Sequence, residues 1–575
     1  MDDAFLRNVR AEILENVHFT LKETDIYRIH QSASLASLDG LHDEALSKFP
    51  TLLRLRDALY SSAFRNYIST VTNCGALSGR KTDMVINLYT PGCYLLCHDD
   101  VFCGRRVSYI LHLTDPDIPW QKEWGGSSRL YPRIRVEDDK IFHTNPSPFF
   151  SKIIPPSWNQ LSFFAARPGE SFHDVEEGYH ANNKDQLEKE GGRIRVTISG
   201  WFHIPQIGEY RYIEGDKQRL FEKSLLLHIY RKLDRFDLPQ LLATKFSFKG
   251  TEDAKLEVAE DAELEGIEDA ELGVTDTDFL LKYLAPTYLT PDTMQQVANH
   301  FTENSSAALD CILSEKFSMK LREHLQKQEL PQFSSIRQEL GTLGWKVARP
   351  PHKHRFLFLQ DSSSLSYSPQ AEAGDLSPVE ELLYVLLPSP PFRKWLELVT
   401  TCGIGGYSVM ARRFRRGLDY VMGKVHEGKP RLEVSICMTP TSGWGDDDSN
   451  DSENELSGEG TNTDIAAKLN GKSKAKGKAK AVEKEKVNLD VGGQEIYFAR
   501  DKEAGDNAAV YGTKTDAECN TVQWTIPATW NKMSIVLRRR GMVKFVRYVS
   551  KSAKGDRWDI SGVYGVEEEN CVRKL

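Results

Sequence analysis

The sequence predicts an α+β, β-rich fold that contains two double-stranded β-helix (jelly-roll) domains with flanking helices, and three observations point to it. Short strand-like runs separated by Gly, Pro, Asn and Asp recur between residues 83 and 202. A second series of such runs extends from residue 356 to residue 548. Apolar residues at helical spacing lie ahead of both series. Many short strands with this punctuation are typical of a jelly roll, whose interior has room for a metal ion and a small cosubstrate.

The length and charge of the chain limit its class. A chain of 575 residues is too long for one core, and at about 100–200 residues per domain it predicts two to four units. The net charge of −8 argues against a protein that coats nucleic acid, and we expect no sequence-specific nucleic-acid binding. No apolar run approaches the roughly 18 residues of a membrane span. The N-terminus has no apolar signal core and the nine cysteines are scattered, so we expect a reducing compartment, the cytoplasm and nucleus.

The first predicted domain comprises residues 1–245. Its first part, 1–80, is expected to be mostly helical with a short extended piece over 24–31, because apolar residues recur at helical spacing over 51–71. A jelly roll is expected over 81–205, followed by helical spacing over 216–245. The expected strands are 83–89, 94–101, 106–113, 128–131, 161–165 and 193–202.

An acidic linker is predicted over residues 246–277, where the near-repeat EDAELEG and IEDAELG is almost without aromatic residues. The second predicted domain, 278–575, begins with helices and contains no His-x-Asp or His-x-Glu pair. Its expected strands are 356–360, 407–414, 431–437, 496–499, 522–526, 533–537 and 543–548.

A charged insertion interrupts the second domain. Residues 445–486 start with an acidic block and end with a basic one, without apolar periodicity, which predicts disorder. The lysine run over 472–486 has two interpretations, a nuclear-localisation patch and the solvated end of a loop.

The candidate chemistry of the chain lies between residues 85 and 203. His98 and Asp100 follow a strand-like run, and alternation along a strand points their side chains the same way. An imidazole beside a carboxylate supplies two of the three ligands of a 2-His-1-carboxylate triad, which holds Fe(II) on one face. His173 follows the next buried run and offers the third ligand. Arg195 opens the strand after that, and its guanidinium suits bidentate capture of a carboxylate.

Other residues compete for these roles. His143, His180 and His203 are alternatives to His173 as the distal ligand, and His180 is the strongest of the three because it follows His173 closely. Arg193 and Arg195 are two residues apart and are expected to point to the same face of their strand, so alternation alone does not decide which of them binds the carboxylate.

Three cysteines near His98 raise a zinc interpretation. Cys93, Cys97 and Cys103 follow a C-x3-C-x5-C spacing, whereas structural zinc sites use paired C-x2-C. Cys97 is also expected to point away from His98 on the strand. Buried cysteines that act as small apolar residues are the simpler account.

The motifs NLYTPGCYLLCHDD, RRVSYILHLTDP, SFHDVEE and RVTISGWFH resemble the Fe(II)- and 2-oxoglutarate-dependent ribosomal prolyl 3-hydroxylase / prolyl 3,4-dihydroxylase family of the fungal type. The resemblance implies Fe(II) held by His98, Asp100 and His173, with 2-oxoglutarate and O2 as cosubstrates and L-ascorbate as a candidate reductant. It places His173 after the family's turn and Arg195 at the cosubstrate carboxylate. It also implies a catalytic first domain and a non-catalytic second jelly roll.

The resemblance assigns cosubstrate contacts to three more residues. Tyr89 matches a tyrosine whose hydroxyl helps to hold 2-oxoglutarate, with an ordinary core tyrosine as the alternative. Thr197 adds a hydroxyl contact to the same carboxylate. His112 departs from the family, which usually has tyrosine there. A histidine at this position has two possible effects, a hydrogen bond to 2-oxoglutarate and competition for iron.

Two functions remain open at this stage. The resemblance implies a peptidyl-proline dioxygenase whose partner is a small-subunit ribosomal protein, with an effect on the accuracy of translation termination. The alternative is an oxygen- or iron-responsive scaffold, in which the C-terminal domain binds proteins of translation termination or transcription-factor turnover.

Overall fold

The computed structural model describes residues 1–40, 42–101, 104–138, 141–179, 193–223, 237–240, 244–245, 271–329, 344–360, 376–444, 491–499 and 522–567, together with Gln186 and Lys189. We refer to residues 1–223 as the N-terminal half and to residues 271–567 as the C-terminal half. Most of the predicted linker and the charged insertion with its lysine run lie outside the described residues.

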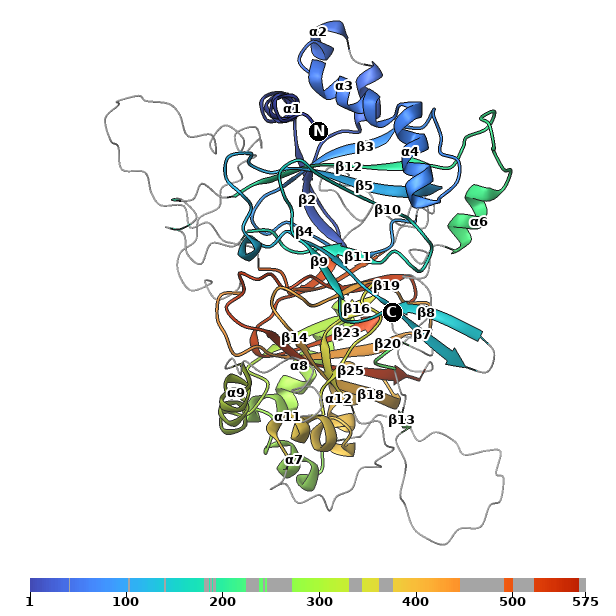
Figure 1. The fold of residues 1–575 in the computed structure, drawn as a ribbon. Coiled ribbons are helices and arrows are strands. Elements are labelled where there is room, and N and C mark those ends of the chain that lie inside the picture. Colours follow the sequence, from blue (N-terminus) through green and yellow to red (C-terminus); the bar gives the residue numbers. More distant parts are fainter. Residues whose placement is uncertain are drawn as a thin grey trace.

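The N-terminal half contains a ten-stranded antiparallel sheet, in which the strand order is β10-β5-β12-β3-β2-β4-β11-β6-β9, with β1 paired to β2. The strands β3, β5, β10 and β12 form one layer, and β4, β9 and β11 lie below it in Figure 1. The strands are β1 (Thr20–Glu23), β2 (Tyr27–Gln31), β3 (Asp83–Tyr89), β4 (Tyr94–His98), β5 (Arg105–Leu113), β6 (Ser128–Leu130), β9 (Lys152–Ile154), β10 (Gln160–Ala165), β11 (His173–Val175) and β12 (Arg195–His203). A separate hairpin pairs β7 (Arg133–Asp138) with β8 (Ile141–Pro146).

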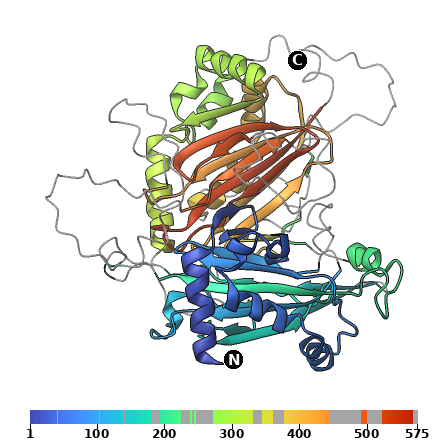
Figure 2. The same ribbon diagram turned by 90° about the horizontal axis from the view of Figure 1, so that it is seen from above.

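Helices cover the outer face of the first layer (Figures 1 and 2). Alternate residues of β3, β5 and β12 point toward these helices and share one hydrophobic cluster with them. Because successive strand residues face opposite sides, the other face of the same three strands is turned inward, and it carries Tyr89, His112, Arg195 and Thr197. The helical segments are α1 (Asp3–Asn16), η1 (Leu35–Gly40), α2 (Asp43–Leu46), α3 (Pro50–Leu59), α4 (Ser62–Thr72), η2 (Lys122–Trp124) and α6 (Asp216–Lys223).

The C-terminal half has two sheets. An eight-stranded sheet has the order β14-β23-β20-β25-β18-β17-β15 with β13 paired to β18, and a five-stranded sheet has the order β16-β19-β24-β21-β22. The first comprises β13 (Thr244–Lys245), β14 (Ser306–Asp310), β15 (Lys346–Val347), β17 (Leu357–Leu359), β18 (Ile404–Phe414), β20 (Arg431–Met438), β23 (Trp530–Arg538) and β25 (Arg557–Val566). The second comprises β16 (His354–Arg355), β19 (Tyr420–Val425), β21 (Glu495–Ala499), β22 (Val522–Ile526) and β24 (Met542–Val546).

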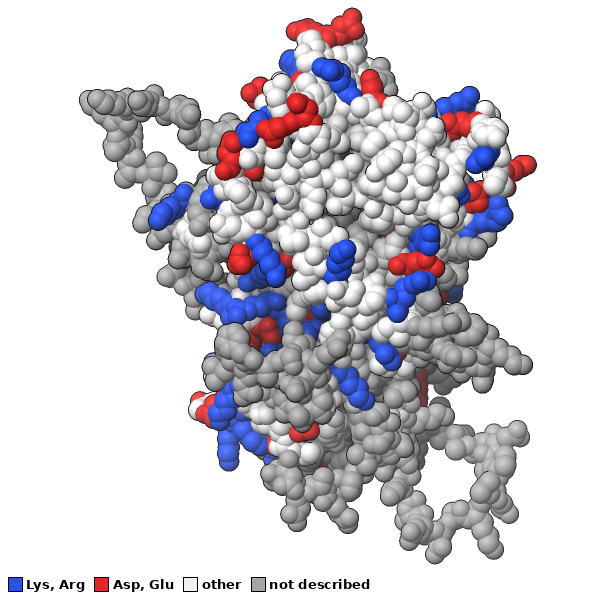
Figure 3. Space-filling model, viewed as in Figure 1, with Lys and Arg blue, Asp and Glu red and all other residues white. Residues whose placement is uncertain are grey.

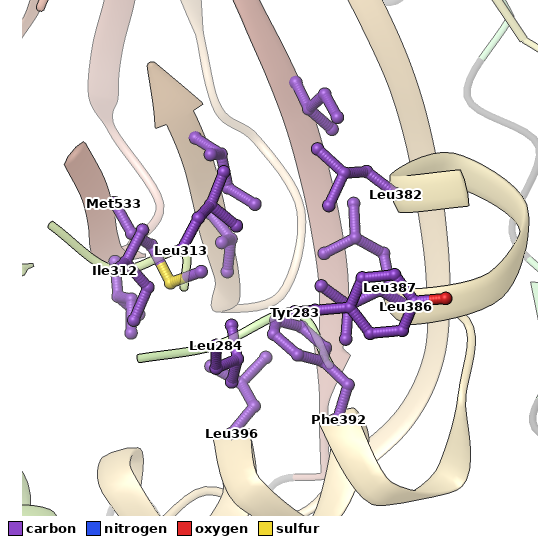
Figure 4. Packing of buried hydrophobic residues seen from close by; sticks show 14 of the residues in the cluster. Tyr283, Leu284, Ile312, Leu313, Leu382, Leu386, Leu387, Phe392, Leu396 and Met533 are labelled. Carbon is purple, nitrogen blue, oxygen red and sulfur yellow. The ribbon is translucent and has the colours of Figure 1, made fainter. Parts of the chain in front are cut away.

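Helices at the far end of the C-terminal half pack on the eight-stranded sheet (Figure 1). Figure 4 shows Leu386 and Phe392 from these helical segments in the same cluster as Met533 of β23. Burial of so many large apolar side chains, at about 25 cal/mol per Å², gives this half a core of its own. The segments are α7 (Val274–Leu280), η5 (Pro286–Leu289), α8 (Pro291–Asn304), α9 (Glu315–Glu329), α11 (Pro378–Glu380), η6 (Glu381–Leu386) and α12 (Pro390–Thr400).

The structure confirms the β-rich fold, and most expected strands lie within two or three residues of their predicted bounds. Several strands were not predicted, among them β14, β19 and β25, and β25 lies between β20 and β18 in the eight-stranded sheet. One predicted strand was too long, because 94–101 ends as β4 at His98.

Two predicted boundaries also shift. Helix α7 begins at Val274, inside the stretch assigned to the acidic linker. Leu238 pairs with Arg349, and β13 pairs with β18, so these residues of the stretch predicted to be helical lie against the C-terminal half.

Candidate metal and cosubstrate site

Two neighbouring strands bring the predicted histidines together. His173 at the start of β11 pairs directly with His98 at the end of β4. Their ring centroids are 4.2 Å apart. Asp100 completes the group, with its carboxylate oxygens 3.3 Å from His98 Nε2 and 3.5 Å from His173 Nε2. All three residues are buried, each 9 % exposed or less.

The backbone around Asp100 corrects the strand argument that singled it out. Asp100 lies beyond the end of β4 and has a φ of +60°, so a left-handed turn, rather than alternation along a strand, directs its carboxylate toward His98. Aspartate tolerates this conformation better than most residues do. Asp99 holds the turn, because its carboxylate accepts hydrogen bonds from the backbone N–H groups of Val101 and Gly169.

Hydrogen bonds orient both imidazoles. His98 Nδ1 lies 2.7 Å from the carbonyl oxygen of Leu96, and His173 Nδ1 lies 3.0 Å from that of Ser171. A carbonyl only accepts, so Nδ1 carries a proton in both rings, and Nε2 is the nitrogen that faces Asp100. Metal-bound histidines are oriented by the same arrangement.

The charges of the three groups favour ligand chemistry. Burial opposes ionisation of Asp100, but the charge and hydrogen bond of His98 outweigh it and lower the pKa of this carboxyl well below its usual value. Burial and the neighbouring His98 lower the pKa of His173 to about 4, so its imidazole is neutral at pH 7. Burial lowers the pKa of His98 and Asp100 raises it, with a net increase.

The three residues fit a metal ion. Among the described residues, His98, Asp100 and His173 form a group of potential ligands whose ligand atoms all lie within 4.8 Å of one another. Ligands about 2.1 Å from a first-row divalent ion, at right angles to one another, lie about 3 Å apart, close to the separations seen here. Two imidazoles and one carboxylate are the donor set of the Fe(II) facial triad.

A buried cationic pocket lies on the inward face of the neighbouring strands. Arg195 is 1 % exposed, and none of its three guanidinium nitrogens has a hydrogen-bond partner. Arg195 of β12 pairs with Tyr89 of β3 in the sheet. Its guanidinium carbon lies 3.9 Å from the centre of the Tyr89 ring. Burial lowers the pKa of this guanidinium, and Tyr89 raises it in part.

The pocket continues along the same face. Thr197 pairs with His112, and neither the Thr197 hydroxyl nor His112 Nδ1 has a hydrogen-bond partner. Burial and Arg195 lower the pKa of His112 to about 3, so this imidazole is neutral. Buried polar groups are nearly always paired. A cation, a hydroxyl and an imidazole left without partners side by side therefore fit a carboxylate ligand.

The competing residues have other surroundings. His203 Nε2 lies 2.8 Å from Asp83, away from the triad. His143 lies in β8, in the separate hairpin, and His180 lies outside the described residues. Arg193 precedes β12, and its guanidinium stacks over Trp124 at 4.7 Å.

The cysteines do not gather around a metal in the described structure. Cys97 is buried with Tyr131 and Phe172, and Cys93 is buried with Ile29 and Val175, while Cys103 lies outside the described residues. The zinc interpretation therefore gains no support from Cys93 and Cys97.

Sequence reasoning missed the residues that hold β11 from behind. Asp174 accepts hydrogen bonds from Arg129 and Tyr131, and all three are buried. Arg129 and Asp174 pair across β6 and β11, which only the strand register reveals. The sequence offered one signal for Asp174, an acidic residue directly after the candidate ligand His173.

Family models match both halves of the chain. Residues 84–203 match the 2OG-Fe(II) oxygenase superfamily. Residues 275–571 match the family described as "Oxoglutarate and iron-dependent oxygenase degradation C-term". The first match contains all seven residues named for the site.

Similar proteins extend this result. The prolyl 3,4-dihydroxylase OGFOD1 of Ostreococcus tauri is 30 % identical over 569 residues, covering 97 % of this chain and 92 % of that protein. The prolyl 3-hydroxylase OGFOD1 of Xenopus laevis is 34 % identical over 35 % of this chain and 32 % of its own length. The prolyl 3-hydroxylase sudestada1 of Drosophila melanogaster is 32 % identical over 34 % of this chain and 31 % of its own length. The chain therefore belongs to the OGFOD1 family of prolyl hydroxylases, oxygenases that depend on Fe(II), 2-oxoglutarate and O2.

Proposed function

We propose that this prolyl hydroxylase modifies a prolyl residue of a small-subunit ribosomal protein. The observation that carries the proposal is the unpaired, buried Arg195 beside the His98, Asp100 and His173 group, in a chain of this family. The choice of a ribosomal protein rests on the motif resemblance, and we infer an effect on translation termination from the same source.

Each residue of the site has a proposed role. His98, Asp100 and His173 hold Fe(II), while Arg195 pairs with the distal carboxylate of 2-oxoglutarate. The bound iron, with 2-oxoglutarate and O2, supplies the chemistry that inserts one oxygen atom into a prolyl C–H bond and releases succinate and carbon dioxide. The protein fixes the geometry and excludes water, because all these side chains are buried.

Three further contacts follow from the pocket. Thr197 donates its hydroxyl proton to the carboxylate held by Arg195, and the Tyr89 hydroxyl closes the same end. His112 is a hydrogen-bond partner of the cosubstrate rather than an iron ligand, because its ring lies opposite Thr197 and outside the three-residue group. L-ascorbate is the proposed reductant that keeps the iron ferrous.

The proposal extends to the organisation and location of the protein. The N-terminal half forms the catalytic domain and the C-terminal half a non-catalytic jelly-roll domain, joined by an acidic linker and working in the cytoplasm and nucleus. None of the helices in the described part of the chain has the length and apolarity that crossing a membrane requires. On the face shown in Figure 3, basic and acidic side chains are interspersed.

The substrate is tested with the full-length protein loaded anaerobically with Fe(II). Succinate release and mass increase of the peptide are measured with a proline-containing peptide of the small-subunit ribosomal protein and with the same peptide carrying alanine for proline. We expect a gain of one or two oxygen atoms on the proline peptide only. Turnover on unrelated prolyl peptides, with none on the ribosomal one, would overturn the substrate and leave the enzyme class intact.

A second candidate function is favoured by the description of the C-terminal family model, which names degradation. In this reading the C-terminal domain binds a regulatory protein and controls its turnover in response to oxygen or iron. Partner capture by His98→Ala and Asp100→Ala variants separates the two functions. A scaffold keeps its partner in these variants, whereas the hydroxylase product is lost.

Substitution of Arg195 by lysine is expected to raise the KM for 2-oxoglutarate. A lysine keeps the charge but loses the bidentate fork, and loss of a buried charge-assisted hydrogen bond costs about 1.5–3 kcal/mol, or about 10- to 150-fold in affinity. Steady-state succinate release at varied 2-oxoglutarate measures the effect. Arg193→Lys is the matched control, because Arg193 stacks on Trp124 outside the pocket. A larger effect at Arg193 would assign the anchor to that residue.

A further inference from the structure

The C-terminal half lies directly against the strands that carry both histidines. In Figure 1, β4 and β11 lie next to β16 and β19. Tyr94 and Leu96 of β4 share a buried cluster with Tyr420, Met422 and Tyr548. The rings of Tyr94 and Tyr548 are 4.3 Å apart. Strand β4 is therefore packed against the C-terminal half up to two residues before His98.

A buried hydrogen-bonded chain runs from the C-terminal half to β11. Arg355 in β16 donates through Nη1 to the Tyr131 hydroxyl at 3.1 Å, and that hydroxyl donates to Asp174 Oδ2. Arg129 binds both oxygens of Asp174, at 2.7 and 2.9 Å. Arg355 is 3 % exposed and is anchored by Asp419, with 3.5 Å between Nε and Oδ1.

The residues on either side of His173 and Asp174 are held in the same way. The Phe172 ring stacks on the His352 ring, with centroids 5.1 Å apart and planes 24° from parallel. Glu177 is 1 % exposed and accepts hydrogen bonds from the Ser550 hydroxyl at 2.6 Å and the Lys551 backbone N–H at 2.7 Å. The segment from Phe172 to Glu177 therefore contacts the C-terminal half directly at both of its ends.

We propose that the C-terminal half sets the position of the distal histidine, and that Arg355 is a positioning residue that acts on His173 through Tyr131 and Asp174. His173 and Asp174 are successive strand residues and face opposite sides, so a fixed Asp174 side chain fixes the backbone from which His173 projects. Strand β11 has only three residues, and its register pairs two of them with β4 and all three with β6. The inference rests on the proposed role of His173 as an iron ligand.

The proposal has a consequence for metal binding. Substitution of residues that orient metal ligands typically lowers metal affinity by about 10- to 100-fold. Arg355 and Tyr131 act on His173 only through Asp174 and the backbone, so we expect the lower end of this range, about tenfold. The ligands themselves stay in place, so the site binds metal more weakly and in a less uniform geometry.

The test uses the full-length protein with Tyr131→Phe, which removes one oxygen atom, and Arg355→Met. Anaerobic titrations measure the affinity for Fe(II) and for Co(II), whose absorption spectrum also reports the ligand geometry. Thermal unfolding of the metal-free proteins is measured alongside. We expect each variant to lose about tenfold in metal affinity and to alter the Co(II) spectrum. The double variant should lose no more than either single one, since the two residues act in one chain.

Glu23→Gln is the matched control, because Glu23 joins the two halves through Arg547 from β1, a strand without a candidate ligand. Unchanged metal affinity and spectrum in Tyr131→Phe would overturn the inference, as would an equal loss in Glu23→Gln. Tyr131→Phe decides the matter if Arg355→Met does not fold. A His173→Ala variant that binds Fe(II) as tightly as the unaltered chain would instead overturn the proposed ligand role.

Discussion

Replacement of Asp100 by asparagine is expected to abolish both iron binding and prolyl hydroxylation. The change keeps the shape of the side chain but removes the negative charge that faces His98 and His173 at 3.3 and 3.5 Å. A neutral amide is a poor ligand for Fe(II), and two imidazoles alone do not complete the facial triad. His98→Ala should have the same effect. Anaerobic Fe(II) titration and succinate release, with and without peptide, measure the two losses.

The neighbouring aspartate supplies the control. Asp99 accepts backbone hydrogen bonds and is not part of the three-residue group, so Asp99→Asn should still bind Fe(II). Its turnover should fall less than about tenfold, because asparagine keeps one of the two oxygen atoms through which Asp99 accepts hydrogen bonds. If Asp99→Asn lost iron and Asp100→Asn retained it, the assignment of the carboxylate ligand would be wrong.

The second large effect is expected for the stability of the C-terminal half. Glu433 is 2 % exposed and binds Arg538, Lys544 and Arg431. Burial opposes its ionisation, but these cations outweigh burial and hold the pKa of the carboxyl well below its usual value. Glu433→Ala removes the acidic partner of the buried Arg538, while Lys544 keeps only Glu495, 3.0 Å away. Removal of one partner from a buried ionic group costs about 3–5 kcal/mol, so the C-terminal half should unfold at markedly lower denaturant.

Urea unfolding, followed by tryptophan fluorescence and circular dichroism, measures this loss. Asp310→Ala is the matched control, because Asp310 pairs with Lys532 in the same half but is 75 % exposed, and surface pairs contribute about 0–1 kcal/mol. A loss below about 1 kcal/mol for Glu433→Ala would show that water or a relaxed backbone compensates the three cations.

Local patterns were sufficient for much of the fold and for the candidate site. Strand β3 was predicted with the bounds it has, because a Pro-Gly turn follows its largely apolar run. His98, Asp100, His173 and Arg195 were each singled out from residue type and order, and the structure brings the first three within 4.8 Å. These signals survive in the sequence because a ligand set needs particular residue types.

Strand β25 shows where such patterns fail. Arg557 and Asp559 are fully buried in it and bind each other, and Arg412 of β18 binds the same Asp559. Charged residues in a run predict solvent exposure unless the partner is known, and here the partner lies on another strand. The same limit hid Asp174 and Arg129, whose pairing depends on the register of β6 and β11.

The sequence by itself determined the chemistry of this protein, because only a few residue types ligate Fe(II) or capture a carboxylate, and they remain visible in the sequence. Tertiary structure alone decided how they are held. Asp100 reaches His98 through a left-handed turn, and Tyr131 meets Arg355 across a sequence separation of 224 residues. Such contacts arise when two sheets pack, and packing depends on the shape of the whole chain rather than on any local pattern.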